Sequence, residues 1–113
     1  MADCLFCKVV RGEVPAEVVH GTERTLAFRD IAPAAPTHVL VVPRDHHPDL
    51  AALVAADPAL ASEVLAAATE VARQEGLEDG YRLVANTGAD AGQTVFHLHV
   101  HVLGGRGLGW PPG

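Results

Sequence analysis

The fold is decided by one stretch of the sequence, Val95-Phe96-His97-Leu98-His99-Val100-His101-Val102-Leu103. Its histidines alternate with aliphatic residues, which is typical of a half-buried β-strand because successive side chains of a strand point to opposite faces. We therefore predict a strand over 95–103 with Leu98, Val100 and Val102 facing a core. The three imidazoles would share the other face, where each can serve as a base, an acid, a nucleophile or a metal ligand.

The composition fits one domain over residues 1–113. A chain of 113 residues, 49% of them hydrophobic, is long enough to bury a core without disulfide staples. The formal net charge of −6 argues against a nucleic-acid partner, because binding to a phosphate backbone needs a basic face. A small nucleotide is not excluded, since histidines and backbone N–H groups can hold one phosphate.

No membrane or targeting segment is expected. The sequence has no run of about 20 apolar residues, the length needed to span a bilayer. The start, Met1–Cys4, lacks the basic and apolar regions of a signal peptide. We therefore expect a cytoplasmic protein with no membrane partner, whose two cysteines stay reduced.

Hydrophobic patterns and turn residues predict five strands and one main helix in the order β-β-β-α-β-β. The predicted strands cover 17–20, 25–29, 37–43, 81–86 and 95–103. The third shows little alternation, so we expect it to be central and covered on both faces. Because the connections are short, we expect an antiparallel sheet, which makes the fold class α+β.

Three helical segments are expected around these strands. The pattern predicts a short helix or turn over 4–11, a second short helix from 45 to about 55, and the main helix from Asp57 to Gly76. Asp57 can cap the main helix and Gly76 can end it. Its apolar stripe recurs at helical spacing and consists of Leu60, Val64, Leu65, Ala68 and Val71.

The pair Cys4-x-x-Cys7 allows three interpretations. A redox motif of the thioredoxin type would follow a strand, and no strand precedes this pair. Half of a structural zinc site suits the position better and needs two more nitrogen or sulfur ligands. Cysteines without a specific role are the third interpretation. The histidines that could complete a zinc site are His20, His38, His46, His47 and the three of the 95–103 stretch.

The histidine stretch itself leaves several chemistries open. The three side chains can form the polar face of an edge strand, bind one metal ion, or provide a nucleophile with its acid–base partner. The glycine-rich loop 88–94 directly precedes them. It can bring backbone and the Gln93 and Thr94 side chains close to an anion, or it can be a plain hairpin turn.

Several motifs resemble the histidine-triad superfamily, and its Hint branch in particular. His97–Leu103 is similar to the His-φ-His-φ-His-φ-φ motif of that superfamily, in which φ is a hydrophobic residue. Further matches run along the chain in the order of the branch: Phe6-Cys7-Lys8, Gly12–Ala16, Ala27–Ile31, Pro36–His38, Gly92–Phe96, Val102–Arg106 and Trp110–Gly113. The helix at residues 48–76 matches least.

The resemblance implies a homodimer in which two five-stranded sheets join into one of ten strands. It implies hydrolysis of purine nucleoside 5′-phosphoramidates and related conjugates of the AMP–amine type. The nucleoside monophosphate would be released through a nucleotidyl-histidine intermediate, without a catalytic metal. His101 stands where the transferase branch has glutamine, which favours hydrolysis. The alternatives are a dinucleoside polyphosphate hydrolase, a nucleotide-binding regulatory protein with vestigial activity, and a zinc enzyme that uses all three histidines.

The resemblance also implies roles for individual residues. His99 would be the nucleophile, His101 would contact the phosphate and the leaving group, and His38 would orient the nucleophile by a hydrogen bond. The implied nucleotide-binding residues are Leu5, Phe6, Val14, Phe28, Asp30, Ile31, Asn86, Gly92, Gln93, Thr94 and Trp110. Among them, Trp110 would approach the site of the partner subunit.

Members of the superfamily with a similar Cys-x-x-Cys pair bind a structural zinc ion. The matching ligands here are Cys4, Cys7, His46 and His97. His47 stands next to His46, so either of the two histidines could be the third ligand.

Overall fold

The structure is a computed structural model in which residues 4–113 are described. The expectation that no signal peptide is present concerns mainly Met1–Asp3, which lie outside the described residues. The elements are α1 (Leu5–Val10), β1 (Val18–Gly21), β2 (Thr25–Arg29), β3 (Thr37–Pro43), α2 (Leu50–Ala56), α3 (Pro58–Gln74), β4 (Tyr81–Val84), the 3₁₀ turn η1 (Ala89–Ala91) and β5 (Val100–Gly104).

The strands form one antiparallel sheet in the order β1-β2-β3-β5-β4. The prediction of a five-stranded antiparallel α+β fold is therefore confirmed. Strand β3 is buried along its whole length and lies at the centre, as its lack of alternation predicted. Within residues 4–113, no helix combines the length and the hydrophobicity needed to cross a membrane.

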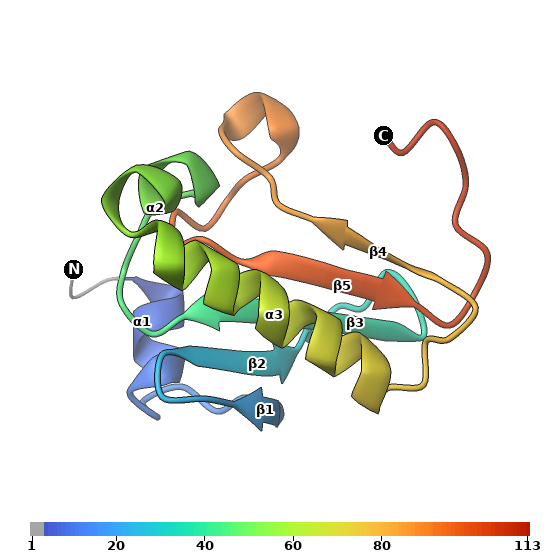
Figure 1. Cartoon of the computed structure of the whole chain (residues 1–113), viewed down its shortest axis with the longest axis horizontal. Coiled ribbons are helices and arrows are strands. Elements are labelled where there is room, and N and C mark those ends of the chain that lie inside the picture. Colours follow the sequence, from blue (N-terminus) through green and yellow to red (C-terminus); the bar gives the residue numbers. More distant parts are fainter. Residues whose placement is uncertain (1–3) are drawn as a thin grey trace.

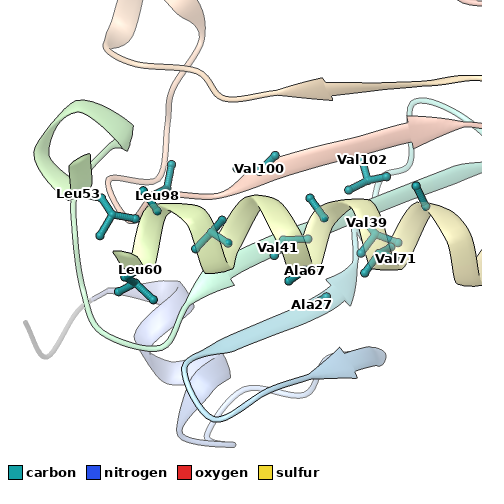
Figure 2. Close-up of a cluster of buried hydrophobic side chains, with 14 of the residues drawn as sticks. Ala27, Val39, Val41, Leu53, Leu60, Ala67, Val71, Leu98, Val100 and Val102 are labelled. Atoms are coloured by element: carbon teal, nitrogen blue, oxygen red, sulfur yellow. The ribbon is translucent and has the colours of Figure 1, made fainter. Parts of the chain in front are cut away.

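Helix α3 covers one face of the sheet (Figure 1). Asp57 caps it by accepting a hydrogen bond from the Leu60 N–H at 3.0 Å. Figure 2 shows the apolar side chains that fill the space between this helix and the strands. The fully buried ones include Ala27, Val39, Val41, Leu60, Val64, Val71, Leu98, Val100 and Val102. This cluster is the main core of the molecule.

The opposite face of the sheet lies under the short helix α1. Its apolar cluster consists of Phe6, Val9, Leu26, Phe28, Leu40 and Val42. His38 lies two residues before Leu40 on β3, and His101 on β5 is the register partner of Leu40. Residues two apart on a strand and directly opposite residues of neighbouring strands share a face. The histidine face of β5 is therefore the α1 face.

The strand predicted over 95–103 was wrong at its beginning, because β5 starts only at Val100. Residues 95–97 bend, and the N–H of Leu98 donates to the carbonyl of His47 at 2.7 Å instead of to a sheet neighbour. The predicted facing is nevertheless confirmed, since Leu98, Val100 and Val102 are all buried in the main core.

Smaller differences concern the ends and the apolar stripe of other elements. Strand β4 ends at Val84, two residues earlier than predicted, and α2 starts at Leu50 after its cap Asp49. Leu65 was predicted to be buried on α3 but is 43% exposed. Spacing alone places Leu65 beside Val64, but the sheet covers only one side of that helix.

Candidate active site

Helix α1 brings two cysteines to two histidines that are distant in the sequence. Sγ of Cys4 lies 3.3 Å from Nδ1 of His97, and Sγ of Cys7 lies 3.5 Å from Nδ1 of both His97 and His46. These four donor atoms all lie within 4.8 Å of one another. A tetrahedral zinc ion with Zn–S of about 2.3 Å and Zn–N of about 2.0 Å needs sulfur–nitrogen separations of about 3.5 Å. The donor set therefore fits zinc.

The ring of His97 is oriented by a backbone carbonyl. Its Nε2 lies 2.8 Å from the oxygen of Pro43 and must donate to it, which leaves the lone pair on Nδ1 facing the two sulfurs. Burial lowers the pKa of His97 and of His46, which favours the neutral rings that metal ligation needs. Burial, together with the neighbouring Cys4, raises the pKa of the Cys7 thiol; a bound cation would reverse that effect.

His99 has one ring nitrogen fixed and one free for chemistry. Its Nδ1 donates to the carbonyl of His97 at 2.8 Å, so its Nε2 carries the lone pair. The ring packs against the edge of Phe6, with centroids 4.9 Å apart and an interplanar angle of 83°. His99 is thus held in one tautomer and one orientation beside the metal-ligand cluster, without belonging to it.

His38 and His101 form a hydrogen-bonded pair. The N–H of Ala34 donates to Nδ1 of His38 at 3.0 Å, so the proton of His38 is on Nε2. That Nε2 lies 2.8 Å from Nδ1 of His101 and donates to it. The remaining proton of neutral His101 is therefore on Nε2. The resemblance implied a bond from His38 to the nucleophile, but in the structure the partner of His38 is His101.

The three triad histidines do not converge on a common point. Nδ1 of His97 faces the cysteines, Nδ1 of His99 faces a carbonyl, and Nδ1 of His101 faces His38. Among the described residues, the potential metal ligands form two separate groups, Cys4–Cys7–His46–His97 and Asp30–His38–His101. This geometry disfavours the interpretation of all three as ligands of one zinc ion.

Acid is expected to destabilise the protein through the buried His38 and the half-buried His101. Burial lowers the pKa of His101 to about 4, with charges on His99 and His38 contributing, and burial also lowers the pKa of His38 against the effect of Asp30. A group with a lowered pKa binds fewer protons in the folded chain than in the unfolded chain. The free energy of unfolding should therefore fall as the pH drops from about 6.5 towards about 4.

Urea titrations at about pH 7.5 and about pH 5 measure this effect. The variant His101→Gln removes one of the responsible groups and serves as the control, with a weaker pH dependence expected. An unfolding free energy that is the same at both pH values would contradict the assignment.

A cavity of about 260 Å³ opens on the α1 face, next to the histidine pair. Six of the residues named from the resemblance line it: Leu5, Phe6, Val14, Phe28, Asp30 and Ile31. The sequence did not single out five others that also line it: Val9, Pro15, Ala16, Arg29 and Leu40. Leu40 could have been predicted to line this face, because its side chain points away from those of Val39 and Val41 on a strand that is buried on both faces. Most of the lining is apolar, and Asp30 supplies a carboxylate at the rim.

Gln93 is not positioned to donate to a ligand. Its side chain is buried; Oε1 accepts from the N–H of Gly88, and Nε2 donates to the carbonyls of Pro48 and Val95. Both amide protons are therefore used within the protein. Gln93 instead braces the loop that leads into the histidines, where Gly92 adopts a positive φ of 90°.

Four other predicted nucleotide-binding residues lie outside the cavity lining. Gly92 and the exposed Thr94 belong to the loop before His97, and Asn86 is half-buried just beyond β4. Trp110 is 83% exposed on the C-terminal tail, where Arg82 donates to the carbonyl of Gly109 at 2.7 Å.

The sequence model of the HIT domain matches residues 11–108. The chain belongs to the HIT family. A 14 kDa zinc-binding protein of Zea mays is 48% identical over 111 residues, with 96% of this HIT chain and 87% of the maize protein covered.

Solved structures of the HIT family agree with the fold. A HIT family hydrolase from Legionella pneumophila is 48% identical with a TM-score of 0.94, covering 98% of this chain and 100% of that one. A histidine triad nucleotide-binding protein from Candida albicans is 31% identical with a TM-score of 0.84, covering 96% and 83%. The fold expected for a HIT protein is thus confirmed, and the Legionella neighbour supports hydrolase chemistry.

Proposed function

We propose that this HIT protein hydrolyses purine nucleoside 5′-phosphoramidates and related nucleotide conjugates, releasing the nucleoside monophosphate. One observation carries the proposal: His99 offers a lone pair on Nε2 while His101, with its ring centroid 5.0 Å away, offers a proton on Nε2. A nucleophile beside an N–H that can hydrogen-bond to the leaving nitrogen suits cleavage of a P–N bond, since that nitrogen gains negative charge and must pick up a proton as it leaves.

In the first step, Nε2 of His99 attacks phosphorus and the bond from phosphorus to the amine breaks. The N–H at Nε2 of His101 donates a hydrogen bond to the leaving nitrogen, which takes a proton from a water molecule as the bond breaks, so His101 stays neutral. Positive charge develops on the nucleotidylated ring of His99. The carbonyl of His97, which accepts from Nδ1 of His99, stabilises the same positive charge.

In the second step, the water molecule that gave up its proton attacks phosphorus as hydroxide, while His101 keeps its own proton. The bond from phosphorus to His99 breaks, and the nucleoside monophosphate leaves with the ring restored. Imidazole suits both steps, because it is a good nucleophile and, once positively charged, a good leaving group.

The apolar cavity is the proposed site for the base of the nucleotide. Phe6 and Phe28 are T-shaped neighbours with centroids 5.5 Å apart and offer aromatic surface for a purine. Asp30 is proposed to bind the ribose hydroxyls, and Thr94 with the backbone near Gly92 to bind the phosphate. Asn86 is proposed to contribute an amide beside that phosphate.

We also propose that Cys4, Cys7, His46 and His97 bind one structural zinc ion. The donor distances support it, and the maize relative is named as a zinc-binding protein. Such an ion would cross-link α1 to the segment before β5. The chemistry on phosphorus would not use it.

A homodimer is part of the same proposal. Strand β4 is an edge strand of the described sheet, with Tyr81 on it 41% exposed, so it can pair with its copy into a ten-stranded sheet. In that arrangement, the exposed Trp110 of one subunit would approach the nucleotide site of the other.

Incubation with adenosine 5′-phosphoramidate tests the proposed function. We expect the protein to release AMP and ammonia with turnover. Chromatography of the nucleotide measures the rate of AMP release. Diadenosine tetraphosphate is the comparison substrate, and we expect it to be cleaved more slowly. Tight AMP binding without turnover of any phosphoramidate would contradict the proposal and favour a regulatory nucleotide-binding protein.

A further inference from the structure

We infer that Arg106 is a positioning residue that, by holding the backbone of Ala34, keeps the proton of His101 on the nitrogen that faces the substrate. The inference rests on the proposed function for its effect on turnover. Its structural part, the link from Arg106 to His101, stands on the hydrogen bonds alone.

The link runs through four groups. Nη2 of Arg106 donates to the carbonyl of Ala34 at 2.9 Å, while its Nη1 donates to the carbonyl of Gly107 at 2.8 Å. The N–H of the same Ala34 donates to Nδ1 of His38 at 3.0 Å. Nε2 of His38 then donates to Nδ1 of His101 at 2.8 Å. Arg106 therefore braces the residue that fixes the tautomer of the histidine pair.

The loop that carries Ala34 needs such a brace. Ile31 is 98% exposed, and Ala32, Pro33 and Ala34 are also exposed. Exposed loops without packing are mobile. This loop is held at its start, where Oδ1 of Asp30 accepts from the Ala32 N–H at 2.8 Å.

The end of the loop is held next to Arg106. There Gly105 adopts a φ of +90°, and a Cβ added to it would lie 2.9 Å from Cβ of Pro36. Between the two ends, Arg106 reaches across from the chain after β5 to the carbonyl of Ala34. Its forked guanidinium bridges two carbonyls at once, which an ammonium cannot do in the same geometry.

Loss of the Ala34 donor would free His38 to take the other tautomer. Nε2 of His38 would then accept from Nδ1 of His101, and Nε2 of His101 would have no N–H to donate to the leaving nitrogen. Oδ2 of Asp30 also faces Nε2 of His38 and favours the working tautomer, but at 3.5 Å it is beyond a strong hydrogen bond. The hydrogen bond from the N–H of Ala34, at 3.0 Å, is shorter than this contact and therefore constrains the tautomer of His38 more strongly.

The test combines kinetics with ¹⁵N NMR of histidine-labelled full-length protein. In the wild type, we expect a scalar coupling between Nε2 of His38 and Nδ1 of His101 across their hydrogen bond. Arg106→Ala should weaken or abolish it and lower kcat for adenosine 5′-phosphoramidate about tenfold, the order of one lost positioning hydrogen bond, with KM unchanged. Arg106→Lys, which keeps one donor, should restore the coupling and most of kcat.

Arg82→Ala is the matched control, because Arg82 also donates from Nη2 to a backbone carbonyl, that of Gly109, in the same C-terminal segment. It should leave the coupling between His38 and His101 intact. An unchanged coupling in Arg106→Ala would overturn the inference, whatever the activity. Absence of phosphoramidase activity in the wild type would overturn the proposed function instead, while the coupling would still report on the role of Arg106.

Discussion

Replacing His99 with alanine is expected to lower kcat/KM for adenosine 5′-phosphoramidate by at least about 10⁴-fold, since removal of a covalent nucleophile has effects of this order in other enzymes. The lone pair on Nε2 of His99 is the one positioned for attack, because Nδ1 of His101 is taken up by His38. In the alanine variant, water would have to attack phosphorus directly, without a covalent intermediate. Release of AMP measured by chromatography gives the rates.

Two controls separate chemistry from folding in this experiment. His99→Gln keeps much of the side-chain volume against Phe6 and should be as inactive as the alanine variant while unfolding at a similar urea concentration. His20→Ala changes a half-buried histidine that contacts Gln74 at 3.3 Å, far from the described site, and should keep its activity. Activity of His99→Ala within tenfold of the wild type would contradict the assigned nucleophile.

Loss of the proposed zinc ligand His46 is expected to have the largest effect on stability. His46→Ala should lower the zinc content from one ion per chain to none and reduce the free energy of unfolding by at least about 3 kcal/mol, a modest share of what structural zinc contributes to small domains. Without the ion, α1 would be held only by the cluster around Phe6 and Val9. Metal analysis and urea unfolding measure the two effects.

The neighbouring variant His47→Ala is the matched control. The ring of His46, not that of His47, lies within 3.5 Å of Sγ of Cys7, so His47→Ala should retain the zinc. A full zinc content in His46→Ala, or its loss in His47→Ala, would contradict the ligand set. Chelation should lower kcat only partly, because the proposed zinc ion would act on His99 indirectly, through the carbonyl of the proposed ligand His97.

Where the sequence pattern follows from local geometry, the prediction was accurate. Strand β3 was predicted with its observed bounds, because a short run rich in β-branched apolar residues and closed by Pro43 is typical of a strand covered on both faces. The predicted start of strand β5, at residue 95, was earlier than the observed start at Val100. Alternation records which side chains are buried, and this holds from Leu98 onwards, but it does not record that the backbone of Leu98 pairs with His47 rather than with a strand.

The sequence indicated which histidines share one face of the sheet, but not which group each ring contacts. Equal spacing makes His97, His99 and His101 equivalent in the sequence, whereas their ring nitrogens face three different partners that depend on the tertiary fold. Gln93 was similarly expected to face a ligand, but loop closure brought Gly88 and Pro48 to its amide. Arg106 ended one of the matching motifs, but its contact could not be predicted, because its partner Ala34 is 72 residues away.

The central claim is that His99 becomes covalently nucleotidylated, and mass spectrometry of the quenched reaction tests it most directly. Protein mixed with an excess of a slowly hydrolysed AMP–amine conjugate is quenched under mildly alkaline conditions, which preserve phosphoimidazole bonds, and digested into peptides. The account predicts an adenylyl group on His99, absent from His99→Ala. An adenylyl group on His38 or His101 instead, or rapid turnover with no adduct in the wild type, would contradict it.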